Sequence, residues 1–125
     1  MSKAVPHPDV SQINLSALYD ALSDPIRRRI VRMLGDGGEL NCALFYTLGS
    51  KTRLSYHLAR MREAGLTRTR VAGRRHFIRL RTEDLERLFP GWLDAVVASA
   101  RIEATTPDAQ LDAGVAAAEH GLELG

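Results

Sequence analysis

Cations, hydroxyls and one aromatic ring gather between Ser50 and Arg81, and hardly any acid lies among them. Residues 50–81 hold ten Lys and Arg against one Asp or Glu, a local charge of +9. The other residues hold seven against fourteen, or −7, so the formal net charge of +2 conceals a strongly polarised chain. Positive charge concentrated in this way is typical of a surface that binds nucleic acid.

An amphipathic helix is predicted to position the first half of this basic stretch. Leu54, Leu58 and Met61 recur at i, i+4 and i+7, the spacing of one buried helical face. Ser50 suits the N-cap, and Gly65 suits the left-handed residue that follows a helix end. The candidates for contact with nucleic acid here are Ser50, Lys51, Thr52, Arg53, Ser55, Tyr56, His57 and Arg60. For His57, a packing role between helices is the alternative.

A β-hairpin is predicted to position the second half. Apolar residues alternate with arginines on both sides of the turn Ala72-Gly73-Arg74-Arg75. One face of the hairpin can therefore pack on the core, while the arginines, including Arg79 and Arg81, face outward. Arg74 and Arg75, at the tip, complete the candidate contact set. A basic helix beside a basic hairpin repels itself, and a polyanion relieves that repulsion. The alternative is that these charges form only a solvated face.

Helical patterns fill most of the remaining chain. We expect helices over residues 14–23 and 25–34, the second starting at Asp24-Pro25, burying Ile26, Ile30 and Leu34 and turning Arg27, Arg28 and Arg32 outward. Asn41 suits the N-cap of a short third helix that buries Leu44 and Leu48. A short helix joined by a tight turn to a second one forms a helix-turn-helix, and the hairpin then forms a wing. Further helices start at Thr82 and Pro90.

Length and composition exclude several classes of protein. The 125 residues suit one small domain, and no apolar run is long enough to span a membrane. There is no signal-peptide pattern, and a single cysteine cannot form an internal disulfide, so we expect a cytoplasmic protein. The four histidines are scattered, and no nucleophile–base pair or phosphate-binding glycine loop stands out, so we do not expect an enzyme.

The predicted organisation is a flexible arm (1–12), one folded unit (13–104) and an acidic, Ala-rich, disordered tail (105–125). The first and last helices carry more apolar surface than one small domain buries, which predicts a two-fold homodimer. The expected interface residues are Leu15, Leu18, Tyr19, Trp92, Leu93, Val96, Val97 and Ala100.

Several strings, over about residues 14–103, resemble the ArsR/SmtB-type winged-helix repressors. They are ALSDPIRRRIVRML, ELNCALF, SKTRLSYHLARMREAGL and GRRHFIRL. The resemblance implies a mainly α fold with a small β-hairpin in the order α-α-α-α-β-β-α. It also implies a homodimeric transcriptional regulator that binds double-stranded DNA, in a family whose operator affinity is often lowered by an inducer. By this likeness Thr52, Arg53, Ser55, Tyr56 and His57 read the groove, and Arg74 and Arg75 lie at the wing tip.

The chain departs from the metal-sensing members of that family. Where those carry a Cys-x-Cys pair, this chain has Asn41 and Ala43, so the soft thiolate ligands are missing. Cys42 lies between them and is expected to pack inward. We therefore expect no metal and no cofactor, and a repressor whose small-molecule effector, if it has one, is unknown. The alternative is a winged-helix module that binds a protein partner or RNA through its basic face.

Overall fold

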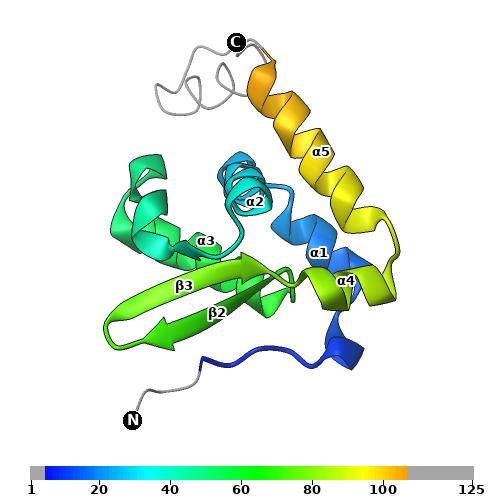
Figure 1. Ribbon diagram of the computed structural model, residues 1–125, viewed down its shortest axis with the longest axis horizontal. Helices are drawn as coiled ribbons and strands as arrows, with labels where there is room; N and C mark the ends of the chain where they lie inside the picture. The colour runs from blue at the N-terminus through cyan, green and yellow to red at the C-terminus, as the bar shows by residue number, and fades with distance from the viewer. Residues whose placement is uncertain (1–4, 107–125) are drawn as a thin grey trace.

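A computed structural model describes residues 5–106 and places three α-helices around a small antiparallel sheet, followed by two more helices (Figure 1). Helix α2 packs against strand β3 and helix α5, and α3 packs against β2. The elements confirm the predicted succession of helices and hairpin. In chain order they are η1 (Val10–Gln12), α1 (Leu15–Ala21), α2 (Pro25–Gly37), β1 (Leu40–Asn41), η2 (Cys42–Leu48), α3 (Lys51–Glu63), β2 (Thr67–Ala72), β3 (Arg75–Leu80), α4 (Thr82–Leu88) and α5 (Trp92–Thr105).

Side-chain caps start the first three α-helices; those of α2 and α3 were predicted, whereas Asn14 was expected inside the first helix and caps it instead. The side chain of Asn14 accepts from the amide of Ala17 at 2.9 Å, and that of Asp24 accepts from Ile26 at 2.8 Å. Ser50 caps α3 by accepting the Arg53 amide at 3.2 Å. Each cap satisfies a backbone donor that has no partner within the helix, which fixes where the helix begins.

Helix α2 continues three residues beyond the predicted end at Leu34. Gly35 lies against Val97 of α5, and a Cβ at this glycine would come within 2.6 Å of the valine side chain. The two helices can approach closely because Gly35 has no side chain, and this packing offsets the low helix propensity of glycine. The helix ends at Gly38, whose φ of 73° is left-handed.

The third helical segment, η2, is a 3-10 helix, and this changes which residues it buries. Asn41 caps it as predicted, accepting the Ala43 amide at 3.0 Å. A 3-10 helix has three residues per turn, so Phe45 faces the core and Leu44 points away. Phe45 is fully buried and Leu44 is 52% exposed. The expectation that Leu44 is buried assumed α-helical spacing and is wrong.

Strands β2 and β3 form the predicted hairpin, with Ala72 paired to Arg75 across a turn in which Gly73 takes a φ of 63°. The short strand β1 pairs with β3 on its other side, giving the order β1-β3-β2. Ile78 and Leu80 are buried as predicted. Arg81 is the exception to the expected outward arginines, because its side chain is only 2% exposed.

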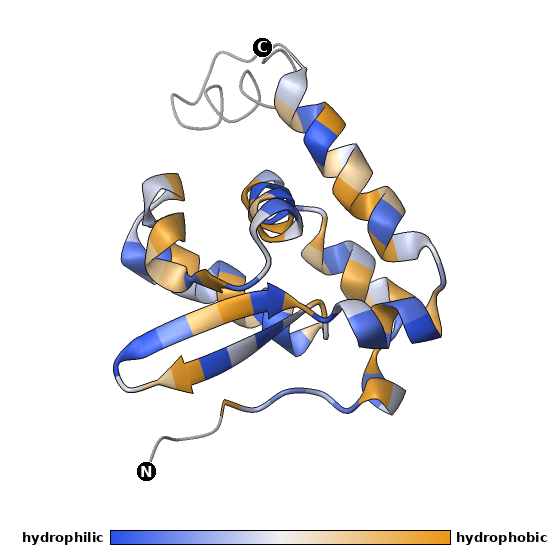
Figure 2. Ribbon diagram, viewed as in Figure 1, coloured by the Kyte–Doolittle hydropathy of each residue, from blue (hydrophilic) through white to orange (hydrophobic). Residues whose placement is uncertain are grey.

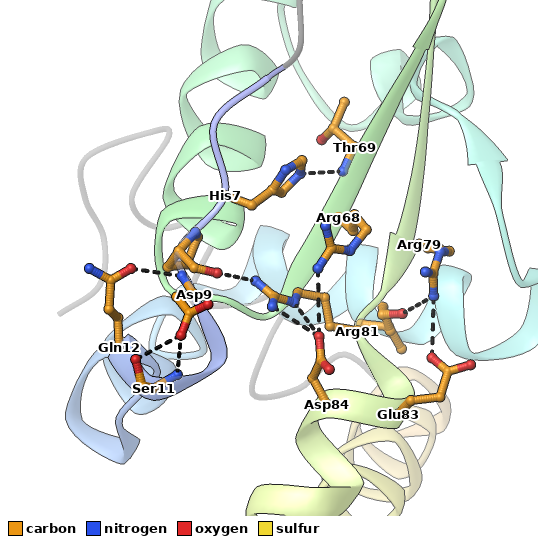
Figure 3. Close-up of polar contacts among 12 residues, drawn as sticks. His7, Asp9, Ser11, Gln12, Arg68, Thr69, Arg79, Arg81, Glu83 and Asp84 are labelled. Atoms are coloured by element: carbon orange, nitrogen blue, oxygen red, sulfur yellow. Dashed lines mark hydrogen bonds and ion pairs between the residues drawn. The ribbon is translucent and has the colours of Figure 1, made fainter.

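Arg81 is buried because two groups, the Asp84 carboxylate and the Pro8 carbonyl, satisfy its guanidinium through three contacts (Figure 3). Its Nε lies 3.0 Å from Asp84, and its Nη1 donates to the carbonyl oxygen of Pro8 at 2.9 Å. The pKa of the Asp84 carboxyl is lowered, first by the hydrogen bond from Arg81 and then by the charges of Arg81, Arg68 and Arg87. Arg81 therefore joins the end of the hairpin to α4 and to the N-terminal segment.

Residues 5–12, expected to form part of a flexible arm, run along β2, the outer strand of the hairpin (Figure 1). His7 accepts the Thr69 amide through Nε2 at 2.9 Å (Figure 3). Asp9 and Gln12 form a reciprocal capping box around η1. Ile13 then packs beside Gly65, and a Cβ at this glycine would come within 2.5 Å of the isoleucine side chain. The φ of Gly65 is 86°, as expected for the left-handed residue predicted at this position.

The core lies between α2, α3, the sheet and the last two helices. Its largest fully buried side chains are Leu18, Ile30, Val31, Phe45, Leu54, Met61, Leu66, Thr67 and Leu85. Leu54, Leu58 and Met61 are buried as their spacing predicts. Among the residues described, no helix is both long and apolar enough to cross a membrane. Of the predicted tail, residues 107–125 lie outside the described part of the chain.

Candidate nucleic-acid interface

The outer face of α3 presents most of the predicted contact residues. Lys51, Thr52, Arg53 and Ser55 are exposed, and Tyr56 is 59% exposed although its ring is large and partly apolar. These side chains occupy the first half of the helix, opposite the buried stripe. An exposed helix face with cations, hydroxyls and an aromatic ring can donate hydrogen bonds to phosphates and to base edges.

Two residues predicted to belong to this exposed face, His57 and Arg60, contact other side chains of the same chain instead. His57 is only 9% exposed, and its Nδ1 lies 3.1 Å from a guanidinium nitrogen of Arg27 on α2. Arg60 is exposed, but it lies 3.3 Å from Asp20 and 3.7 Å from Glu63. His57 therefore packs between α3 and α2 in this structure, and the charge of Arg60 is compensated by the two acids.

Ion pairs divide the ten cations of residues 50–81 into two equal groups. Five have carboxylate partners: Arg60 with Asp20, Arg68 with Asp84, Arg70 with Glu39, Arg79 with Glu83 and Arg81 with Asp84. The pair between Arg70 and Glu39 has two hydrogen bonds, of 3.1 and 2.8 Å, which lower the pKa of the Glu39 carboxyl. Acids from elsewhere in the chain thus neutralise half of the basic stretch.

The other five cations have no carboxylate partner within the part of the chain that the structure describes. They are Lys51, Arg53, Arg62, Arg74 and Arg75. Two lie at the start of α3 and two at the wing tip, where Figure 2 colours the start of β3 as hydrophilic. Lys51, Ser55 and Arg74 line one cleft, so the helix and the wing tip present their charge together.

The face shared by α1 and α5 contains both exposed apolar residues and core residues. Tyr19 is 55% exposed and Leu15 39%, and Trp92 donates its indole N–H to the Tyr19 hydroxyl at 3.1 Å. A groove of about 520 Å³ runs between α1, α2 and α5, lined by Tyr19, Trp92 and Val96 among others. In Figure 2, α5 carries apolar residues along much of its length.

Four of the predicted interface residues are buried within the single chain. Leu18, Leu93 and Val97 belong to the core, and Ala100 is 6% exposed. The apolar periodicity of the two helices does not distinguish the side that packs on α2 from the side left open. Ile102, absent from the predicted interface, is 67% exposed on α5.

The start of η2, where a thiolate pair would hold a metal, does not provide a ligand set. The Asn41 side chain is used as a helix cap, and Ala43 has no donor atom. Cys42 is half-buried rather than buried, and its Sγ lies 3.8 Å from the hydroxyl of Tyr46. Within residues 5–106, no three His, Cys, Asp or Glu side chains form a group that could hold a metal ion.

The sequence interpretation missed two arginines. Arg27 was expected outside but is 8% exposed, and its Nε donates to the carbonyl oxygen of Ala21 at 2.6 Å. The signal was present, because Arg27 shares a helical stripe with the buried residues Ile30, Val31 and Leu34. Arg62 is half-buried near the wing, and its spacing carried the same signal, because it follows the buried Leu54 and Leu58 at i+8 and i+4.

Two curated relatives share this sequence over most of their own length. One, an uncharacterised HTH-type transcriptional regulator, YceK of Bacillus subtilis, is 38% identical over 85 residues, which is 63% of this chain and 82% of the relative. The other is the arsenic resistance transcriptional regulator ArsR1 of Pseudomonas putida, 35% identical over 97 residues, or 74% of this chain and 72% of the relative. The chain belongs to the ArsR family of transcriptional regulators.

Solved structures agree with this family assignment. The homodimeric winged helix-turn-helix DNA-binding domain of Mb0332 from Mycobacterium bovis is 30% identical to this ArsR-family chain, with a TM-score of 0.54. The match covers 74% of this chain and 84% of that domain. No protein-family model matches the sequence. The protein is therefore a DNA-binding transcriptional regulator of the winged helix-turn-helix type, with α3 as its second helix and β2–β3 as its wing.

Proposed function

We propose that this ArsR-family protein is a repressor that binds an inverted-repeat operator in double-stranded DNA as a homodimer. In this proposal α3 enters the major groove, and the wing contacts the flanking phosphates or the minor groove. The observation that carries the proposal is the gathering of four exposed cations without carboxylate partners at the start of α3 and at the wing tip. Lys51, Arg53, Arg74 and Arg75 have no such partner among the described residues, whereas Arg60, Arg68, Arg70 and Arg79 are paired with acids.

Within this surface we assign two kinds of contact. Thr52, Arg53, Ser55 and Tyr56 face outward from the first half of α3, where side chains of a recognition helix reach base edges. Ser50, Lys51, Arg74 and Arg75 flank them and suit the phosphates. His57 and Arg60 are left out of the base-reading set, because one is buried against Arg27 and the other is paired with acids.

The homodimer is supported by the apolar face of α1 and α5. Leu15, Tyr19 and Ile102 are exposed there, and Trp92 and Val96 line the groove beside them. Burial of this face against its own copy around a two-fold axis would remove it from water. The related Mb0332 domain is homodimeric. Two α3 helices in such a dimer would meet half-sites about one helical turn apart, roughly 10 base pairs.

We further propose that metal ions are not the signal. The relative ArsR1 is an arsenic resistance regulator, but here Asn41 and Ala43 replace a thiolate pair and leave Cys42 as the only thiol. A single thiol beside a tyrosine hydroxyl is a poor ligand set for a soft metal. We also propose that the protein acts in the cytoplasm and has no enzymatic activity. Any small-molecule effector would belong to a different class from metal ions.

Selection of bound duplexes from a random pool tests the central proposal. A repressor of this kind should enrich an inverted repeat and bind it orders of magnitude more tightly than a scrambled duplex of the same length. Affinities measured at two salt concentrations separate the electrostatic part of binding from sequence readout. Equal affinity for the selected and scrambled duplexes would indicate an interaction module that uses its basic face for RNA or a protein partner.

A further inference from the structure

A cleft of about 390 Å³ lies between α3, η2 and the wing. Lys51, Ser55 and Arg62 of α3 form one wall, and Arg74 and His76 of the wing form the opposite one. The cleft is large enough for a small metabolite, since ligand pockets span about 300–1,000 Å³. Its lining extends beyond the proposed DNA contacts to Arg62 and His76, and none of it belongs to the proposed dimer face.

The charged side chains that line this cleft are cations, and no carboxylate is among them. Lys51, Arg62 and Arg74 have no ion-pair partner among the described residues, although Arg60, only two residues from Arg62, has two. The Nε of Arg62 is moreover buried without a hydrogen-bond acceptor in this part of the chain. The guanidinium of Arg62 is thus incompletely satisfied, and an anion in the cleft would be stabilised by its charge together with the charges of Lys51 and Arg74.

The floor of the cleft is apolar. Leu58 and Ile78 are buried beneath the charged walls, and Ala59 lies beside them on α3. The hydroxyl of Tyr46 and the thiol of Cys42 border the third side. An apolar floor below cations and hydroxyl donors fits a ligand with a compact apolar body and one oxyanion group, better than it fits a bare inorganic ion.

We propose that this cleft binds a small organic anion, a carboxylate or phosphate monoester on an apolar group, and that its binding weakens DNA binding. The inference rests on the proposed function, because Lys51, Ser55 and Arg74 belong both to the cleft and to the proposed DNA surface. A ligand that occupies these groups competes with DNA phosphates for the same cations. Because binding is reciprocal, DNA should lower the affinity for the anion by the same factor.

Phenyl phosphate is a suitable probe, since it joins an apolar ring to a phosphate monoester. We would titrate it into the isotope-labelled full-length protein and follow the backbone amide resonances of Ser55, Ala59 and Ile78. Saturable shifts at these positions are expected, with weaker shifts from inorganic phosphate and none from phenol. Phenyl phosphate should also raise the apparent Kd for the selected duplex more than sodium chloride of equal ionic strength does. Absence of saturable shifts at millimolar phenyl phosphate would overturn the proposal.

Arg62→Gln separates the anion site from the DNA surface, because Arg62 is outside the proposed DNA contacts. This variant should lose on the order of tenfold in phenyl phosphate affinity while it keeps its affinity for the duplex. Arg87→Gln, which changes an exposed arginine on α4, serves as the matched control and should alter neither. Unchanged phenyl phosphate affinity in Arg62→Gln would contradict the proposal.

Two further experiments distinguish the possible outcomes. If Arg62→Gln does not fold, Ala59→Glu, which adds a carboxylate to the same wall, should abolish the shifts caused by phenyl phosphate. If duplex DNA shifts the amide resonances of the cleft and phenyl phosphate does not, the cleft binds only a phosphate of the DNA backbone and the inference fails. A wild-type protein that binds no duplex would refute the proposed function, yet the phenyl phosphate titration would still test the cleft.

Discussion

A guanidinium nitrogen of Arg27 lies 3.1 Å from Nδ1 of His57, and this contact joins α2 to the buried side of α3. The same arginine donates through Nε to the carbonyl oxygen of Ala21, at the end of α1. A guanidinium can only donate, so His57 must accept through an unprotonated Nδ1 and be neutral. One buried arginine therefore ties the proposed recognition helix to a helix of the proposed dimer face.

Removal of this contact should cost stability. We expect Arg27→Gln and His57→Ala each to lower the free energy of unfolding by about 1–3 kcal/mol, because each leaves buried polar groups without partners. Urea unfolding monitored by circular dichroism measures this. Arg32→Gln on the same helix, whose pair with Asp36 is 3.8 Å long and partly exposed, is the matched control and should change little. A stable His57→Ala protein with weakened DNA binding would instead favour a direct contact of His57 with DNA.

The stability should also depend on pH through His57. Its pKa is lowered from 6.5, first by burial and then by the charges of Arg27 and Arg53, while Asp24 acts in the opposite direction. The unfolded chain therefore binds more protons than the folded one below pH 6.5, and stability rises with pH there. The full contribution is present above pH 6.5 and is lost as the pH falls through the lowered value. Urea midpoints measured across this range check it.

His7 adds to the same trend, since its pKa is lowered by burial and by Arg68, Arg62 and Arg81, although a hydrogen bond at Val5 opposes this. Protonation of Nε2 would remove the acceptor that holds the Thr69 amide. The pH dependence should thus be shallower in His57→Gln and shallower still when His7→Gln is added. An unchanged slope in the double variant would show that other groups control it.

The sequence specified the parts of this fold that depend on local rules. Ser50, Asp24 and Asn41 were predicted as caps and act as caps, because an N-cap needs only its own helix. Residues whose environment is set by distant partners were mispredicted. Arg81 is buried because Pro8 and Asp84 complete its hydrogen bonds, and no local pattern reveals the carbonyl of a residue so far away in the chain.

The candidate site shows the same division. The sequence predicted the local charge of the basic stretch. It could not predict which cations are paired, because Glu39 and Asp20 approach the stretch only in the folded chain. Likewise, Val97 and Val96 look alike in sequence. Only the crossing of α5 over Gly35 assigns Val97 to the core and leaves Val96 beside the open groove.

The dimer proposal predicts the effect of charge on that open face. Val96→Glu should give monomers at micromolar concentration, because a carboxylate would be buried against the partner copy without a counterion. These monomers should bind the selected duplex weakly, since each engages one half-site. Sedimentation velocity measures the assembly. Ala98→Glu on an exposed part of α5 is the matched control and should remain dimeric. A wild-type protein that sediments only as a monomer would refute the arrangement.

The lack of a thiolate pair at the start of η2 predicts that metal ions do not change the affinity for DNA. Zn(II), Cd(II) or As(III) added to chelator-treated protein should leave its affinity for the selected duplex unchanged, since Cys42 has no second thiolate in the chain. Fluorescence anisotropy with labelled duplex measures this, and Cys42→Ser should behave as the wild type does. A stoichiometric zinc site with a sub-micromolar Kd that releases DNA would contradict the prediction.

The two kinds of proposed DNA contact should respond differently to alanine. Arg53→Ala and Tyr56→Ala on α3 should each cost about 1–3 kcal/mol on the selected duplex and relax preference at particular base pairs. Arg74→Ala and Arg75→Ala at the wing tip should weaken selected and scrambled duplexes alike and reduce the dependence of log Kd on salt. Anisotropy titrations of both duplexes at two salt concentrations distinguish these patterns.

Arg79→Ala is the matched control for the wing series. It removes a cation from the same hairpin, but one that lies 3.5 Å from Glu83 and so attracts DNA less than the unpaired tip arginines do. Its effect on binding and on the salt dependence should therefore be much smaller than that of Arg74→Ala. If Arg79→Ala and Arg74→Ala weaken binding equally, net charge alone governs affinity and ion pairing does not define the surface. If Arg53→Ala and Tyr56→Ala lose affinity equally on both duplexes, α3 is not the element that reads the sequence.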